Sequence, residues 1–266
     1  MEKTFDTVDM KVAEAEFFLR KMAGCGFDLE EFQFYFSAYL SASRTVTLAL
    51  QQFKDLDGFE AWYAPHQEKL KKNQTAKFFL NTRNSHVHGG GYPIRGGSSH
   101  GRTHTFHFFD YDHNDVELGD DDVLARSRSF FLSLIEIVYD CYVELGPQID
   151  PQQFYTKEHF GGSIDQAEAQ IYGWIMTSFI DEGFSEDDRW SELRSRLDSC
   201  KINHLFKAYL GKVTPQPVEP EHYQDFEPSD EDRGWVHIPA GFKNIEEWMG
   251  FIKQERSAQQ GSGGNG

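Results

Sequence analysis

Apolar side chains recur at helical spacing through most of the first half of the chain. The longest stripe follows Asp28, where Glu31 three residues later predicts a capped helix start. It contains Phe32, Phe36, Tyr39, Val46, Leu50 and Phe53. A stripe of this length is typical of a helix that packs against other helices along most of its length. The sequence therefore predicts an all-α fold, a helical bundle.

Four further helices are expected around this one. The first contains Val12 to Met22 and ends at Gly24, and a shorter one spans residues 59–70, interrupted by Pro65. Another spans 73–88 and is stopped by glycines. The fourth begins at the three aspartates 120–122 and is closed by Gly146-Pro147. The segment 88–119 between the last two is expected to be a long loop, with a short strand within 103–111. These elements form the first predicted domain, residues 1–150.

The second half is predicted to be a helical extension, residues 151–256. Apolar spacing indicates helices within 164–180 and 185–210, and a last short helix after residue 244. Four prolines and seven acidic residues lie between positions 214 and 233, which predicts an extended acidic connector. The Gly/Ser/Asn-rich tail, residues 257–266, is expected to be disordered.

Charge and cysteine content exclude several classes of protein. The formal net charge is −17, which argues against coating a nucleic-acid backbone or docking on an anionic membrane, so an anionic ligand needs a local site. Three cysteines without CxxC pairs make neither a disulfide framework nor a zinc site. The polar N-terminus is unlike a signal peptide, and no apolar run is long enough to span a membrane. We expect a cytoplasmic protein.

Arg83 is the residue that does not fit its helix. It occupies a core-facing slot between Leu80 and Val87, where a buried guanidinium without partners is costly. One interpretation is a structural ion pair with a carboxylate on a neighbouring helix, Glu31 or Glu136. The other is that Arg83 faces a polar cleft with functional groups. A histidine at the helix end, His88, favours the cleft. At 100° per residue it lies about 140° from Arg83, which is not one face of an ideal helix, but the helix is expected to unwind there, and His86 lies only about 60° from Arg83.

This region resembles a known family. The run from Lys77 to Asn84, an Arg-Asn dipeptide near a helix end after a Phe-rich turn, followed by His88, is similar to the motif of HEPN domains. The upstream helix, residues 31–44, is similar to the second helix of that fold. The resemblance covers roughly residues 8–146. It implies a helical bundle that dimerises, so that two motifs form one composite site, and many members are metal-independent endoribonucleases of defence or toxin–antitoxin systems.

The resemblance also implies roles for individual residues. Arg83 would hold and polarise the scissile phosphate, and Asn84 would orient the site. His88 would act as general acid or base on the 2′-hydroxyl or the leaving 5′-oxygen, with His86 as the other candidate. The products would be a 2′,3′-cyclic phosphate and a 5′-hydroxyl. No cofactor is expected, and the expected partners are RNA, a second copy of the chain, and a neutralising or activating protein.

Two alternatives remain beside the ribonuclease. The first is a non-catalytic HEPN-like module for interaction or dimerisation, in which Arg83 is a structural ion pair. The second is a metal-dependent enzyme that uses the His-rich loop 86–113, which holds six of the eleven histidines. The same loop is also a candidate to close over the cleft, with Arg95 and Arg102 contacting RNA phosphates.

Overall fold

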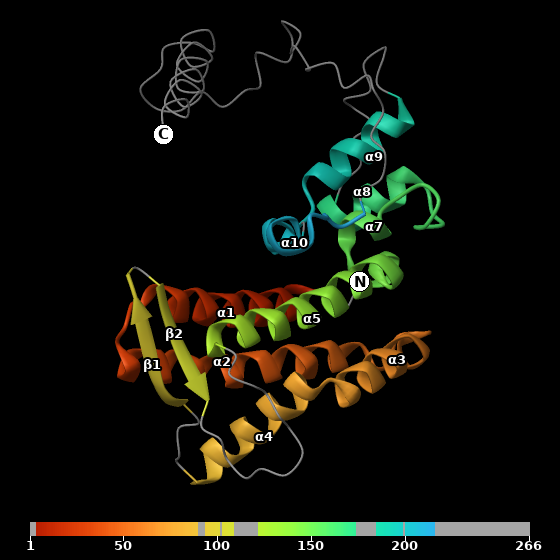
Figure 1. The fold of residues 1–266 in the computed structure, drawn as a ribbon. Coiled ribbons are helices and arrows are strands. Elements are labelled where there is room, and N and C mark those ends of the chain that lie inside the picture. Colours follow the sequence, from red (N-terminus) through yellow and green to blue (C-terminus); the bar gives the residue numbers. More distant parts are fainter. Residues whose placement is uncertain are drawn as a thin grey trace, which may run out of the picture. The chain divides into compact units, whose positions relative to one another are not determined.

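A computed structural model of the chain is mostly helical, which confirms the predicted fold class (Figure 1). It describes residues 4–89, 94–101, 103–108, 122–173, 185–198 and 200–215, except for the side chains of residues 85–89 and 95. The described residues all belong to one unit, Met1–Glu219. No described helix combines the length and the apolar character needed to cross a membrane.

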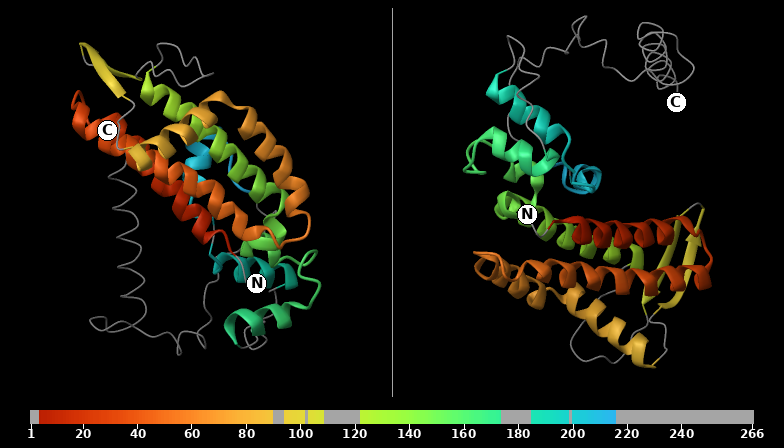
Figure 2. Two further views of the ribbon diagram at one scale, coloured as in Figure 1. Left: turned by 90° about the horizontal axis from the view of Figure 1, so that it is seen from below. Right: turned by 180° about the vertical axis from the view of Figure 1, so that it is seen from behind.

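Long helices form the main body of this unit. Helices α1 and α2 pack as an antiparallel pair, α5 packs against both, and α3 and α4 continue along α2 (Figures 1 and 2). Their bounds are α1 Asp6–Gly24, α2 Leu29–Leu50, α3 Phe59–Lys72, α4 Gln74–Gly89 and α5 Val123–Glu144, with a 3-10 turn, η1, at Gln51–Phe53. The predicted stripe of α2 is buried from Phe32 to Phe53, so the sequence periodicity identified the core correctly.

The starts of α2 and α5 follow the predicted capping chemistry, whereas the prediction for Pro65 inside α3 is wrong. Asp28 caps α2 by accepting a hydrogen bond from the Glu31 N–H at 2.9 Å. Asp122 caps α5 by accepting from the Ala125 N–H at 3.1 Å. The expected interruption at Pro65 is wrong, since α3 continues through this residue. Tertiary packing outweighs the single backbone hydrogen bond that proline removes, because Phe59 and Tyr63, which lie one turn apart on the same face of α3, are both buried.

Part of the expected loop is a β-hairpin. Strand β2, Thr103–Phe108, lies within the predicted strand region, but its antiparallel partner β1, Ile94–His100, was not expected. Glycine and serine are weak strand formers, so β1 carries little sequence signal. Its Gly97 is required by packing, because a Cβ there would lie 2.7 Å from the Thr105 carbonyl oxygen. The hairpin joins the bundle where the Phe106 ring stacks on Phe32, with centroids 3.9 Å apart.

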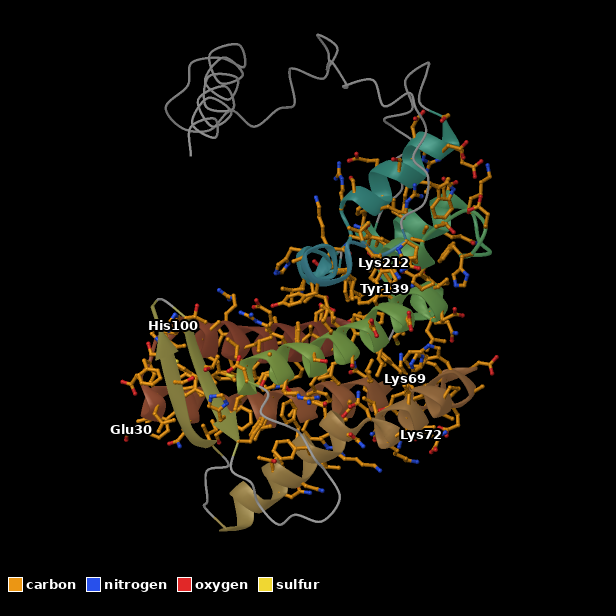
Figure 3. The ribbon with its side chains drawn as sticks, in the orientation of Figure 1. Glu30, Lys69, Lys72, His100, Tyr139 and Lys212 are labelled. Atoms are coloured by element: carbon orange, nitrogen blue, oxygen red, sulfur yellow. The ribbon has the colours of Figure 1, made fainter. Side chains whose placement is uncertain are left out.

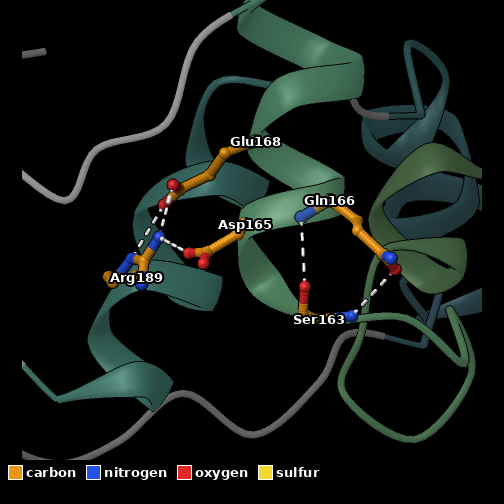
Figure 4. Close-up of polar contacts among 5 residues, drawn as sticks. All are labelled: Ser163, Asp165, Gln166, Glu168 and Arg189. Carbon is orange, nitrogen blue, oxygen red and sulfur yellow. Dashed lines mark hydrogen bonds and ion pairs between the residues drawn. The ribbon is translucent and has the colours of Figure 1, made fainter.

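Shorter helices complete the described chain: α6 Gly146–Ile149, α7 Pro151–Phe154, α8 Ile164–Tyr172, α9 Glu186–Ser195 and α10 Asn203–Leu210. Helix α10 packs on α5, while α8 and α9 enclose a second small core around Trp190. Arg189 of α9 reaches Glu168 and Asp165 of α8 beside this core (Figure 4). The predicted helices are thus found in shortened form. Positions 174–184, most of the acidic connector and the tail lie outside the described residues.

A buried carboxylate ties α1 to α5 and to the segment before α10. Asp9 accepts hydrogen bonds from the Tyr142 hydroxyl at 2.8 Å and from the Lys201 N–H at 2.9 Å. Burial raises the pKa of Asp9 from 3.8 to about 6. The folded chain therefore binds this proton more tightly than the unfolded chain does. The resulting stabilisation is complete below about pH 4 and is lost as the pH rises through about 6.

We expect this group to make the free energy of unfolding fall between about pH 4 and pH 7. A shift of about two pKa units corresponds to a decrease of at most about 3 kcal/mol. Urea denaturation across this range measures the decrease, with Asp9→Asn as the comparison because asparagine does not titrate. Equal decreases in the wild type and in Asp9→Asn would contradict the assignment.

Candidate functional site

A pocket of about 410 Å³ opens between α2, α3 and α4. Its wall on α2 and the start of η1 runs from Leu40 to Gln51, which corresponds to about 16 Å at 1.5 Å per residue. The Tyr63 hydroxyl of α3 donates to the Thr47 carbonyl oxygen at 3.3 Å and holds α3 against this wall. Helix α4 begins where α3 ends. Arg83 is six residues after Lys77 on α4, which places it about 9 Å further along the helix. The pocket is therefore an elongated groove with Arg83 toward one end.

The charged residues of the described pocket wall are all basic. They come from three helices: Arg44 from α2, Lys71 from α3, and Lys77 and Arg83 from α4. In a chain with a net charge of −17, such a set is a local exception. Segment 67–83 explains it, since it contains five basic residues and a single acidic one, Glu68. Figure 3 labels two further cations of this segment, Lys69 and Lys72 on α3. The wall thus favours an anionic ligand.

Arg83 is the least exposed cation of this set. Its side chain is half-buried, one terminal nitrogen donates to Asn84 Oδ1 at 3.2 Å, and its Nε is buried without a hydrogen-bond partner. Within the described part of the chain it makes no ion pair with a carboxylate, and Glu136, one of its expected partners, instead lies 3.9 Å from Lys69. The structural ion pair is therefore not found among these residues. A guanidinium with a free buried donor suits a phosphate or carboxylate ligand.

The position of Arg83 differs from the expected core slot. Leu80, one turn before it, is 41% exposed and lines the pocket instead of the core. The core-facing residue of this turn is Phe79, whose ring packs edge-on against Phe130 at 5.2 Å between centroids. The face of α4 that we expected to be buried therefore carries a buried residue, Phe79, and an exposed one, Leu80, and both line the pocket.

The other cations are more exposed, and only one of them pairs with a carboxylate among the described residues. The Arg44 guanidinium donates to Thr47 Oγ1 at 3.1 Å, and Lys71 Nζ lies 2.7 Å from Glu68 Oε1. Lys77 has no ion pair among the described residues. Exposed pairs of this kind contribute little free energy, so an anion in the pocket can compete for these side chains.

The expected catalytic residues are only partly described. Arg83 and Asn84 hydrogen-bond to each other at the pocket, as given above. His86 and His88 belong to the last turns of α4, but their side chains lie outside the described residues. The side chain of Arg95, on β1, also lies outside them, as does the whole of Arg102.

The histidines of the hairpin do not form a metal site with described residues. His104 Nδ1 lies 3.0 Å from Ser99 Oγ, and His107 Nε2 lies 3.5 Å from Ser98 Oγ. No group of three or more potential metal ligands occurs within the described ranges. His86, His88 and His113 of the metal hypothesis lie outside the residues whose side chains are described.

Sequence reasoning identified Arg83 but missed Arg44, Lys71 and Lys77. The signal that points to two of them is the basic run between residues 69 and 77, which contrasts with the acidity of the rest of the chain. Arg44 carries no such signal, because it is one exposed residue on a long amphipathic helix. Only the packing of α2 against α4 brings it to the pocket.

Comparison with known proteins corrects the family resemblance. The family model that matches is that of bacteriophage lambda protein ea47, over residues 4–93, whereas no HEPN model matches. The resemblance to HEPN domains is therefore wrong. It was based on the short spacing between an Arg-Asn dipeptide and a histidine. No curated protein and no solved structure gives a significant match. The matched segment contains α1 to α4 and is about a third of the chain, so it includes the pocket-lining residues from Leu40 to Arg83.

Proposed function

We propose that this protein binds RNA, with phosphates of a single strand held in the pocket between α2, α3 and α4, and that it cleaves the bound strand without a metal ion. The observation that carries the proposal is the set of four cations on a pocket wall without a described carboxylate. Arg83, with its buried free donor, is the central contact.

Cleavage is proposed from the chemistry at the end of α4. Attack by the ribose 2′-hydroxyl on its own phosphate needs a cation at the phosphate and groups that transfer protons. Arg83 supplies the cation, and His86 and His88 follow it within five residues on the same helix. The imidazole takes a proton from the 2′-hydroxyl, the 2′-oxygen bonds to phosphorus, and the P–O5′ bond breaks as the 5′-oxygen takes a proton from water. The products are a 2′,3′-cyclic phosphate and a 5′-hydroxyl.

Three free cysteines, Cys25, Cys141 and Cys200, support a reducing compartment, and we place the activity in the cytoplasm. A homodimer, a neutralising or activating partner and a role in defence are tested neither by the structure nor by the comparisons, so they stay predictions.

Binding of a labelled single-stranded RNA, measured by fluorescence anisotropy in EDTA, tests the proposal. We expect Arg83→Gln to bind about 10- to 100-fold more weakly than the wild type, since a hydrogen bond to a charged group contributes about 1.5–3 kcal/mol. Arg20→Gln is the matched control, because it removes the same charge from α1, outside the pocket. Equal affinities of the two variants, or a wild type that does not bind RNA, would contradict the proposal.

A further inference from the structure

One face of α4 presents a mostly apolar surface to the pocket. Ala76, Phe79 and Leu80 line the pocket at positions i, i+3 and i+4, so they lie on the same side of the helix. Arg83 lines it one turn after Leu80, about 10 Å along the helix from Ala76. Lys77 lies beside this stripe and is exposed, so its ammonium group can stay in water. A ligand that lies along α4 therefore meets an apolar stripe that ends at a guanidinium.

Residues from the neighbouring helices continue this apolar surface. Leu40 of α2 and Phe130 of α5 line the pocket and are largely buried, and Phe130 packs against Phe79. Leu70, near the end of α3, lines the pocket as well. Counting Tyr63, seven of the fifteen described lining residues are apolar or aromatic, whereas four are charged. The pocket of about 410 Å³ thus has the size and the lining typical of a site for a small molecule.

The phosphate contacts proposed above use only the cations of this pocket. A phosphate gains nothing from the apolar stripe, whereas an alkyl chain gains free energy by covering it. Arg83, at the end of the stripe, has a buried Nε without a hydrogen-bond partner, and its planar guanidinium fits a carboxylate. All charged residues of the described wall are basic, so an anionic head group is favoured over a neutral or cationic one.

We infer that the pocket also binds a long-chain aliphatic carboxylate, with the carboxylate on Arg83 and the alkyl chain along the stripe of Ala76, Phe79 and Leu80. The ligand is a single free molecule and not a lipid bilayer, because the net charge of −17 opposes docking on an anionic membrane. Binding itself is independent of the proposed function. Since both ligands need Arg83, the carboxylate excludes RNA from the pocket, and this competition rests on the proposed function.

Isothermal titration calorimetry with dodecanoate, kept below the concentration at which it forms micelles, tests the binding. Two further probes separate its parts, since acetate carries the head group without the chain and dodecylammonium carries the chain with the opposite charge. We expect dodecanoate to bind at least about tenfold more tightly than either. We also expect a negative heat-capacity change, which marks the burial of apolar surface. In fluorescence anisotropy, dodecanoate should displace labelled single-stranded RNA.

Two matched leucine variants locate the alkyl chain. Leu80→Gln is expected to weaken dodecanoate binding about fivefold, which corresponds to losing about half of the burial of one leucine side chain. It should leave RNA affinity unchanged, because phosphates contact the cations. Leu48→Gln is the control, since Leu48 is similarly exposed on α2 but lies outside the pocket wall. Arg83→Gln is expected to weaken the binding of both ligands about tenfold or more.

Acetate or dodecylammonium that binds as tightly as dodecanoate would overturn the inference, as would equal dodecanoate affinities of Leu80→Gln and Leu48→Gln. Failure of dodecanoate to bind, with RNA binding intact, would overturn it and leave the proposed function standing. Dodecanoate binding that depends on Leu80 and Arg83, in a wild type that does not bind RNA, would support the inference and contradict the proposed function. Binding of both ligands at once, without displacement, would overturn the shared site at Arg83.

Discussion

Replacing His86 and His88 together by alanine is expected to slow RNA cleavage about 10²- to 10⁴-fold and to leave RNA affinity unchanged. This range is the usual contribution of a positioned general acid or base. Affinity is unaffected because the phosphate contacts come from Arg83 and the other pocket cations. The measurement is the rate of cleavage of end-labelled RNA in EDTA, beside RNA binding by anisotropy, and the two single variants show which imidazole transfers the proton.

His204→Ala serves as the control for this experiment, because it removes an imidazole from α10, outside the pocket wall. A double variant that cleaves as fast as His204→Ala would contradict the catalytic role of both histidines. A wild type that binds RNA and leaves it intact would contradict cleavage, and would reduce the function to RNA binding alone.

Removing one member of the buried ion pair between α8 and α9 is expected to give the largest loss of stability. Glu168 is fully buried, and the Arg189 guanidinium donates to it from Nε at 2.9 Å and to Asp165 from Nη2 at 2.7 Å (Figure 4). Arg189→Ala leaves the Glu168 carboxylate buried without its cation. Breaking a buried pair in this way costs about 3–5 kcal/mol.

Urea denaturation of Arg189→Ala measures this loss. The matched control is Arg196→Ala, whose guanidinium is half-exposed and pairs with Glu192 four residues earlier, so that its removal should cost much less, about 1 kcal/mol. The combined variant Glu168→Leu/Arg189→Met should recover part of the loss, because both charges of the buried pair are then removed and Asp165, which also loses Arg189, is exposed to water. If Arg189→Ala and Arg196→Ala were equally stable, the pair would not be the main link between α8 and α9.

The sequence predicted the bundle well because each long helix carries its own evidence. Buried residues of α2 and α5 repeat every three or four positions, and Asp28 and Asp122 mark their first turns. The β-hairpin was half missed for the opposite reason. Strand β1 is built from Gly and Ser residues that have low strand propensity, and it is held by the Phe106–Phe32 contact and by Gly97, neither of which leaves a local pattern.

The candidate site was predictable only where one residue violated a pattern. Arg83 stood out because a charge interrupts an apolar stripe. Arg44 and Gln51 did not, because polar residues on the exposed side of a helix are normal. Their position in one pocket depends on how α2, α3 and α4 pack, and this is tertiary information. The family resemblance added a motif of a few residues, which occurs too easily by chance to replace that information.

The salt dependence of RNA affinity tests the phosphate contacts most directly. For a single strand, the logarithm of the association constant falls against the logarithm of the salt concentration with a slope of about −0.7 per phosphate contact. Four pocket cations therefore give an expected slope of about −3 for the wild type, and Arg83→Gln should make it less steep by about 0.7. A slope that is the same in Arg83→Gln, Arg20→Gln and the wild type would contradict phosphate binding in this pocket.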